Sequence, residues 1–190
     1  MKRIIKPEVL SSKTPYKNKY FSVREDRYLL KNRKEDGELE TVEKDYFFVD
    51  GDNIVVGIVT DGDKILLVNQ FRLATGGFFN EFVAGILEDD VEPEECMKNE
   101  LIEEAGIEAK KVELIGEANV SVGKTNQKAY VFVIDEFIDK GKNELEEFER
   151  YMNLTRKWVN INDFKTMIAN GKIKDFVTLG SWAIYQNKKG

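Results

Sequence analysis

Two runs of β-forming residues joined by one turn signal place the strongest constraint on the fold of this chain. They occupy residues 54–72, IVVGIVTDGDKILLVNQFR, and flank Asp61-Gly62-Asp63. Asp-Gly between β-rich segments is a hairpin signal because glycine accepts the positive φ that tight turns require. We therefore predict a β-hairpin over residues 54–72.

The remaining segments alternate between strand and helix patterns without a regular βα repeat. Residues 20–48 form a second predicted hairpin, with its turn at Asp36-Gly37. Further strands are predicted over residues 78–85, 112–119, 128–137 and 156–161. Helices are predicted over residues 93–105, 162–171 and 175–188, and residues 142–150 form a loop or a short helix. We expect an α+β fold with α/β/α layers and not a Rossmann alternation.

The termini of the last two helices carry specific expectations. Asn162 is a favourable residue at a helix start, and Gly171 at a helix end. In the last helix we expect Phe176, Leu179 and either Trp182 or Ile184 to face the core.

Composition narrows the classes of function. The net charge of −6 argues against non-specific binding to nucleic acid or an anionic membrane. No apolar run is long enough to span a bilayer, and the N-terminus lacks the apolar stretch of a secretory signal. Cys96 is the single cysteine, so an internal disulfide is excluded and a cytoplasmic location is expected.

The chain contains no histidine. This excludes nucleophile systems that use Ser-His-Asp or Cys-His, and it disfavours a zinc site. Carboxylates are abundant, so Mg²⁺ or Mn²⁺ is the cofactor class that the composition favours.

The helix at 93–105 ends in an unusual concentration of acids, Glu100, Glu103 and Glu104. The carboxyl end of a helix carries partial negative charge, and each anion there costs about 0.3–1 kcal/mol. A solvated acidic face is the simplest interpretation. However, Lys and Arg are absent from the positions four residues from Glu100 and Glu104. A divalent cation would turn this repulsion into a binding site.

Residues 84–107, AGILEDDVEPEECMKNELIEEAGI, resemble the Nudix box, G-x5-E-x7-R-E-U-x-E-E-x-G-U, in which U is aliphatic. Seven positions match in register: Gly85, Glu100, Leu101, Glu103, Glu104, Gly106 and Ile107. Val91 and Asn99 replace the Glu and Arg that usually pair in the family to brace the loop against the helix. All the metal-binding carboxylates are retained.

Segments outside the box resemble the branch of the family that contains the ADP-ribose and nucleoside-diphosphate-sugar pyrophosphatases. They are NQFR at 69–72, NEFVAG at 80–85, SVGKTNQKAYVFV at 121–133 and GKIKDFVTLGSWAIY at 171–185. The resemblance implies an α/β/α sandwich with a mixed sheet over residues 46–190. It also implies a small antiparallel extension over residues 1–45 that reaches a second subunit, and hence a homodimer.

The resemblance further implies a Mg²⁺-dependent hydrolase that cleaves the pyrophosphate of ADP-ribose or a related nucleotide sugar. Glu100, Glu104 and the Ala84 carbonyl would hold the metal, with Glu103 as a further ligand. Arg72 would bind phosphate, unless it is an ordinary arginine at a strand end, and Glu81 would contact the nucleoside or the metal shell. The general base would lie on the loop 142–150, with Glu147 preferred over its neighbours Glu146 and Glu149.

The changes at Val91 and Asn99 keep a second hypothesis open, a nucleotide-sugar sensor that binds its ligand without turnover. A DNA-binding regulator is disfavoured by the acidic charge balance.

Overall fold

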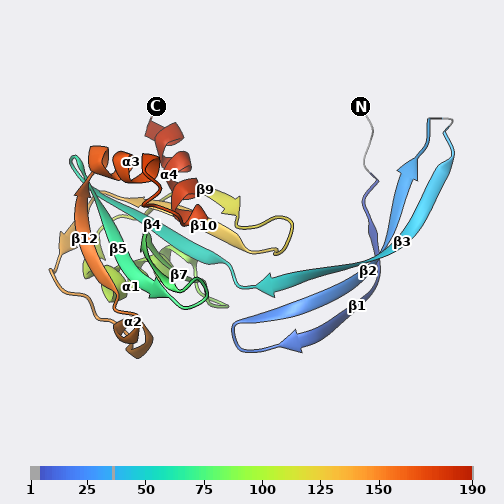
Figure 1. The fold of residues 1–190 in the computed structure, drawn as a ribbon, viewed down its shortest axis with the longest axis horizontal. Helices are drawn as coiled ribbons and strands as arrows, with labels where there is room; N and C mark the ends of the chain where they lie inside the picture. Colours follow the sequence, from blue (N-terminus) through green and yellow to red (C-terminus); the bar gives the residue numbers. More distant parts are fainter. Residues whose placement is uncertain (1–4, 36, 190) are drawn as a thin grey trace. The chain divides into compact units, whose positions relative to one another are not determined.

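The computed structural model describes residues 5–35 and 37–189, which form two compact units (Figure 1). The first unit runs to Asp52 and also includes Ser121–Gln127, and the second contains Asn53–Val120 and the chain from Lys128 onwards. The N-terminal extension is thus longer than the predicted residues 1–45, because its last strand continues to Gly51.

The first unit is a three-stranded antiparallel sheet in the order β1-β2-β3. Its strands are β1 (Glu8–Lys17), β2 (Phe21–Arg33) and β3 (Leu39–Gly51). Strands β2 and β3 pair from Phe21↔Gly51 to Arg33↔Leu39, as the predicted hairpin requires. In the predicted turn, Asp36 lies outside the described residues, and Gly37 has a φ of 89°.

The segment Ser121–Gln127 belongs to the first unit because it bonds to β3. The Val49 amide donates to the Lys124 carbonyl at 2.7 Å, and the Tyr46 hydroxyl donates to the Gly123 carbonyl at 2.9 Å.

The second unit contains strands and helices in mixed order. Its strands are β4 (Ile54–Asp61), β5 (Lys64–Arg72), β6 (Gly77–Glu81), β7 (Val83–Ile86), β8 (Ile107–Ala109), β9 (Glu113–Asn119), β10 (Lys128–Ile134), β11 (Phe137–Asp139) and β12 (Thr155–Asn160). Its helices are α1 (Pro93–Ala105), α2 (Glu147–Tyr151), α3 (Ile161–Ala169) and α4 (Phe176–Lys189).

The main sheet of the second unit is mixed, with the order β12-β5-β4-β10-β9. Strand β10 runs parallel to β4, and the other neighbours are antiparallel. Strands β6 and β7 pair with β5 and β4, and β8 pairs with β11 in a separate ladder. The hairpin predicted over residues 54–72 is confirmed, and residues 78–85 form two short strands and not one.

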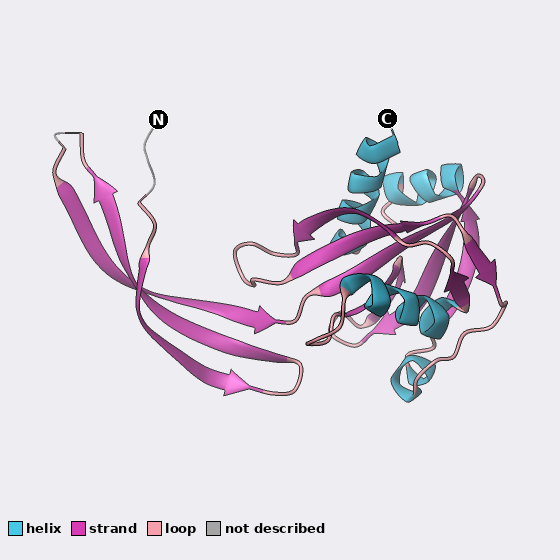
Figure 2. Cartoon of the chain, turned by 180° about the vertical axis from the view of Figure 1, so that it is seen from behind, coloured by secondary structure: helices cyan, strands magenta, loops and turns pink. Residues whose placement is uncertain are grey.

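Each face of this sheet is covered by a different set of helices (Figure 2). Successive strand residues point to opposite faces, so Val55 and Leu66 pack with α1, whereas Val56 and Ile65 pack with α3 and α4. Two apolar layers therefore sandwich the sheet, which confirms the predicted α+β fold with α/β/α layers.

Two expectations about the last helices are wrong in detail. The cap of α3 is Asn160, whose side chain accepts from the Asn162 amide, because the helix begins at Ile161. In α4, Phe176 is 74% exposed. Trp182 is buried, as predicted, and shares one helix face with buried Thr178, Ser181 and Tyr185, whereas Phe176 lies on the opposite side.

None of the helices in the described residues combines the length and the apolar character that a membrane span needs.

Candidate active site

Helix α1 carries the acidic cluster and packs tightly on the sheet. Met97, Leu101 and Ala105 form its apolar stripe and are fully buried. A Cβ atom on Gly57 of β4 would lie 2.9 Å from the Met97 side chain, so the glycine permits this close approach. The helix ends at Gly106, whose φ of 61° is the left-handed conformation that glycine accepts at little cost.

Glu104 and Glu100 face the start of the box, where β7 begins. Glu104 is only 7% exposed, and its Oε2 atom accepts a hydrogen bond from the Ala84 amide at 3.2 Å. Glu100 packs directly over Gly85, where an added Cβ atom would lie 1.8 Å from the Glu100 Oε1 atom. The glycine is therefore required for the carboxylate to occupy this position.

Burial and mutual repulsion raise the pKa values of these acids. Burial raises the pKa of Glu104 to about 8, and the charge of Glu100 adds to the effect. Burial also raises the pKa of Glu100 to about 7, with further contributions from Glu103, Glu149 and Glu146. The pKa of Glu103 is raised by the same causes, burial first and then Glu146 and Glu149. The structure thus gathers at one place acids that repel each other in the ionised form.

The acids predicted to include the general base, Glu146, Glu147 and Glu149, lie at the start of α2. They differ in how strongly they act on the acidic cluster. Glu146 and Glu149 act electrostatically on Glu100 and Glu103, whereas Glu147 is not among the groups that shift their pKa values. The Oε2 atom of Glu149 is buried and has no hydrogen-bond partner among the described residues. A buried carboxylate oxygen without a partner is costly, and a ligand that supplies positive charge would remove the cost.

Glu88 is an acid that the sequence reasoning missed. It lies between β7 and α1 and contributes to the raised pKa values of Glu100 and Glu103. The sequence signal for this role was its position three residues after Gly85. That signal is weak, because neighbouring residues of the same loop are also acidic.

The chemistry of these donors fits a hard divalent cation such as Mg²⁺, which prefers carboxylate and carbonyl oxygens. In the part of the chain that the structure describes, no three His, Cys, Asp or Glu side chains converge closely enough to hold one ion as they stand. To coordinate one ion, the glutamates would therefore have to change rotamer. The neighbouring Ala84 carbonyl could then serve as a further ligand.

Arg72 and Glu81 form an ion pair at the end of β5. The Arg72 Nη2 atom lies 2.5 Å from Glu81 Oε2, and its Nε atom lies 3.1 Å from both carboxylate oxygens. Gln70 Nε2 also donates to Glu81, at 3.3 Å. Burial lowers the pKa of Arg72, but the hydrogen bond to Glu81 and nearby negative charges, including those of Glu104 and Asp175, raise it above its ordinary value. Glu81 is 5% exposed, so the pair holds the arginine in one orientation.

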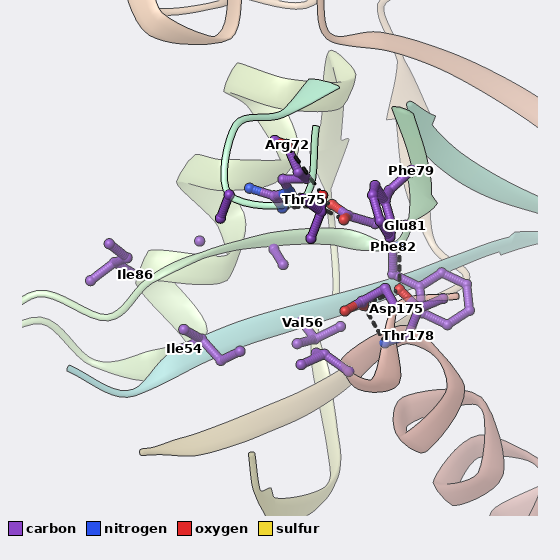
Figure 3. A pocket seen from close by; sticks show the side chains of 14 residues that line it. Ile54, Val56, Arg72, Thr75, Phe79, Glu81, Phe82, Ile86, Asp175 and Thr178 are labelled. Carbon is purple, nitrogen blue, oxygen red and sulfur yellow. Dashed lines mark hydrogen bonds and ion pairs between the residues drawn. The ribbon is translucent and has the colours of Figure 1, made fainter. Parts of the chain in front are cut away.

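A cavity of about 390 Å³ joins these elements. Its lining includes Arg72, Glu81, Ala84 and Gly85, so that the ion pair and the start of the box share one space (Figure 3). The loop before α4 contributes Asp175 to the same lining.

Comparison with known protein families identifies this arrangement. The model of the NUDIX domain matches residues 52–178, which is more than half of the chain. The chain belongs to the Nudix family. The match contains the box, the Arg72–Glu81 pair and the loop that carries Glu146 and Glu149.

Individual relatives point to nucleotide-sugar enzymes. The chain is 30% identical over 122 residues to the GDP-mannose pyrophosphatase of Yersinia pestis, and this alignment covers 60% of each protein. It is 29% identical over 138 residues to the GDP-mannose pyrophosphatase of Cronobacter sakazakii, and that alignment covers 70% of this chain and 68% of the relative. The alignment thus spans less than two thirds of the length of the Yersinia relative.

A solved structure confirms the fold. The crystal structure of an ADP compounds hydrolase superposes with a TM-score of 0.77 and 14% sequence identity, and the match covers 98% of this chain and 96% of that one.

The box of this chain departs from the family pattern at Val91 and Asn99, which replace the usual Glu–Arg pair. In its place, other contacts support the loop that precedes α1. Val91 is half-buried and packs against the core cluster that contains Met97 and Leu101. The Cys96 thiol donates to the Ile86 carbonyl at 3.4 Å, which ties α1 to β7. Burial raises the pKa of this thiol to about 11, consistent with a packing residue and not a nucleophile. Apolar contact and one weak hydrogen bond therefore take the place of the ion pair.

Proposed function

We propose that this protein is a divalent-cation-dependent hydrolase that cleaves the pyrophosphate of a nucleoside-diphosphate sugar. The products would be a nucleoside monophosphate and a sugar phosphate. The observation that carries the proposal is the placement of half-buried Glu100 and buried Glu104 beside Ala84 and Gly85, which line the cavity together with Arg72. The names of the relatives, GDP-mannose pyrophosphatase and ADP compounds hydrolase, support this substrate class.

Glu100, Glu104 and the Ala84 carbonyl would hold Mg²⁺ or Mn²⁺, with Glu103 as a further ligand. When bound, the metal neutralises charge that develops on the pyrophosphate and acidifies a coordinated water. Arg72 would orient a phosphate, since the Nη1 atom takes no part in the pair with Glu81 and a guanidinium matches phosphate oxygens. Glu81 would act mainly by holding Arg72 in place.

Among the three loop acids we assign the general base to Glu149. Its buried Oε2 atom has no partner in the described chain, and its charge reaches Glu100, Glu103 and Glu104. A carboxylate in such surroundings is suited to accept a proton from water. Glu146 also acts on the cluster, and Glu147 is exposed, so we rank them second and third.

Turnover of a nucleotide-sugar panel tests the proposal. Purified protein with Mg²⁺ should hydrolyse ADP-ribose or GDP-mannose, and chelation should abolish the activity. Glu149→Gln should lower kcat by about 10²–10⁴-fold, the usual contribution of a general base, while Glu147→Gln serves as the matched control on the same helix. A protein that binds these compounds tightly but never hydrolyses them would favour the sensor hypothesis.

We also propose that the first unit mediates homodimerisation. Within the described residues its single sheet has no second layer, and it exposes large apolar side chains on every strand, among them Tyr16 at 52%, Tyr46 at 46% and Phe47 at 58%. A three-stranded sheet needs an apolar partner to be stable in water, and a second copy would supply one. Light scattering should give a dimer mass, and Phe47→Lys should shift it toward the monomer. Ile138→Lys, at an exposed strand position of the second unit, should leave the mass unchanged.

A further inference from the structure

The cavity of about 390 Å³ has apolar walls and two sets of polar side chains in its lining (Figure 3). Ile54, Val56, Phe79, Phe82 and Val177 supply the walls. In the view of Figure 3 the Arg72–Glu81 pair lies above Asp175 and Thr178. A ligand that fills this cavity therefore meets the Arg72–Glu81 ion pair and, separately, the carboxylate of Asp175.

Asp175 is held in a single orientation by the start of α4. Its Oδ2 atom accepts from both the amide and the hydroxyl of Thr178, each at 2.7 Å. Thr178 is itself 1% exposed, and its hydroxyl oxygen accepts from the Phe82 amide at 3.4 Å. The carboxylate is thus fixed by a buried partner, and the residues that the structure describes provide no hydrogen bond to its Oδ1 atom.

The charges of Arg72 and Asp175 determine which part of a ligand each side chain accepts. A phosphate is attracted by Arg72 and repelled by Asp175, whose charge also acts on the guanidinium. Asp175 instead suits a neutral group that donates a hydrogen bond. Sugar hydroxyls are such donors, and a fixed carboxylate is a strong acceptor for them because an ionised acceptor shortens and strengthens the bond.

We propose that Asp175 is a specificity residue whose Oδ1 atom accepts a hydrogen bond from a sugar hydroxyl of the substrate, with the pyrophosphate directed toward Arg72. This rests on the proposed function, since it assigns one subsite of the same cavity. The hydroxyl belongs either to the nucleoside ribose or to the terminal sugar, and the two sources are separated by the analogues used below.

The test is a double-mutant cycle between Asp175 and the substrate hydroxyls. Asp175→Asn and Asp175→Ser both retain a residue that caps helices well, so α4 should remain intact. Asp163→Asn is the control, because it removes an exposed acid from the first turn of α3. Wild type and variants are assayed on the best nucleotide sugar and on its analogues deoxygenated at single positions, in the ribose or in the terminal sugar.

We expect both Asp175 variants to lower kcat/KM by roughly 10–100-fold, chiefly through KM, as for the loss of a hydrogen bond to a charged group. One deoxy analogue should lower the wild-type value by a similar factor and should give no further loss in the variants. Asp163→Asn should match wild type, and all variants should keep the wild-type melting temperature.

Unchanged kcat/KM in both Asp175 variants would overturn the proposal, as would equal losses on every analogue together with a lower melting temperature. If wild type hydrolyses none of the nucleotide sugars, the proposed function fails separately. Calorimetric binding of ADP-ribose and GDP-mannose then tests the contact between Asp175 and the sugar hydroxyl. Weaker binding by the Asp175 variants, with Asp163→Asn unchanged, supports that contact. Equal binding, or none by any form, refutes it.

Discussion

The substitution Glu104→Gln tests whether the acidic cluster is a strained, cation-binding site. Glutamine has nearly the same shape, so it removes the charge and leaves the packing on α1 almost unchanged. Its side-chain oxygen can still accept the hydrogen bond from the Ala84 amide. We expect the metal-free variant to be more stable than wild type at alkaline pH, although it lacks a family carboxylate.

The size of this stability difference follows from the pKa of Glu104, which is about 8 in the folded chain against an ordinary value of 4.5. Below pH 4.5 both the folded and unfolded states hold the proton, so the carboxyl adds no cost to folding. As the pH rises toward 8 the unfolded state loses its proton first, and stability falls. At about 1.4 kcal/mol for each pKa unit, the full cost above pH 8 approaches about 5 kcal/mol.

The measured gain in the free energy of unfolding should be smaller, because Glu100 and Glu104 titrate as a coupled pair. Part of the cost belongs to the pair and is not removed by changing one residue. We therefore expect Glu104→Gln to raise the free energy of unfolding by about 2–3 kcal/mol at pH 8.5 in chelator, and by less than about 1 kcal/mol at pH 5. Urea unfolding monitored by tryptophan fluorescence measures this difference. Glu95→Gln removes an exposed acid from the first turn of the same helix and should change stability little at either pH.

Added Mg²⁺ completes the test. Because a ligand that binds only the folded state stabilises it, Mg²⁺ should raise the melting temperature of wild type at pH 8.5 and should hardly affect Glu104→Gln. Turnover should be lost in the variant. A cation-binding role for the cluster would be contradicted if Glu104→Gln were less stable than wild type at pH 8.5 without metal, or if Mg²⁺ stabilised both forms equally.

Three further substitutions probe the geometry around the cluster. Gly85→Ala should displace Glu100 and lower kcat/KM by at least about tenfold, with a melting temperature within a few degrees of wild type, because the clash falls on a movable side chain. Glu81→Gln should raise KM and cost about 1 kcal/mol of stability in urea titrations, since Arg72 loses its ionic partner and is partly solvated. Val91→Glu should cost about 1–3 kcal/mol by the same titrations, because it places a charge against the apolar cluster where this chain has a half-buried valine. A stability of Val91→Glu equal to that of wild type would show that the apolar contact does not brace the loop.

Local patterns in the sequence were sufficient for most of the secondary structure and for the identity of the acidic helix. The turn at Asp61-Gly62 and the helix over residues 93–105 depend on backbone conformations of a few neighbouring residues, and both are found where they were predicted. The exceptions are β1 and β8, the division of residues 78–85 into two strands, and the start of α3. In α4, Trp182 is buried as predicted, whereas packing against the sheet leaves Phe176 on the exposed side, which propensity does not reveal.

Most helices and strands, the family and the three carboxylates on α1 could be predicted from the sequence, because they depend on spacing within short segments. The groups that meet these carboxylates and line the cavity are known only from the folded chain. The pairing of Arg72 with Glu81, the position of Glu100 over Gly85 and the approach of Glu149 to the cluster join residues on different elements. The bond between Asp175 and Thr178 is local, but the long-range bond between Phe82 and Thr178 places both residues at the cavity. Such contacts are set by strand register and by the packing of helices on the sheet, and the residue types at each position do not specify them.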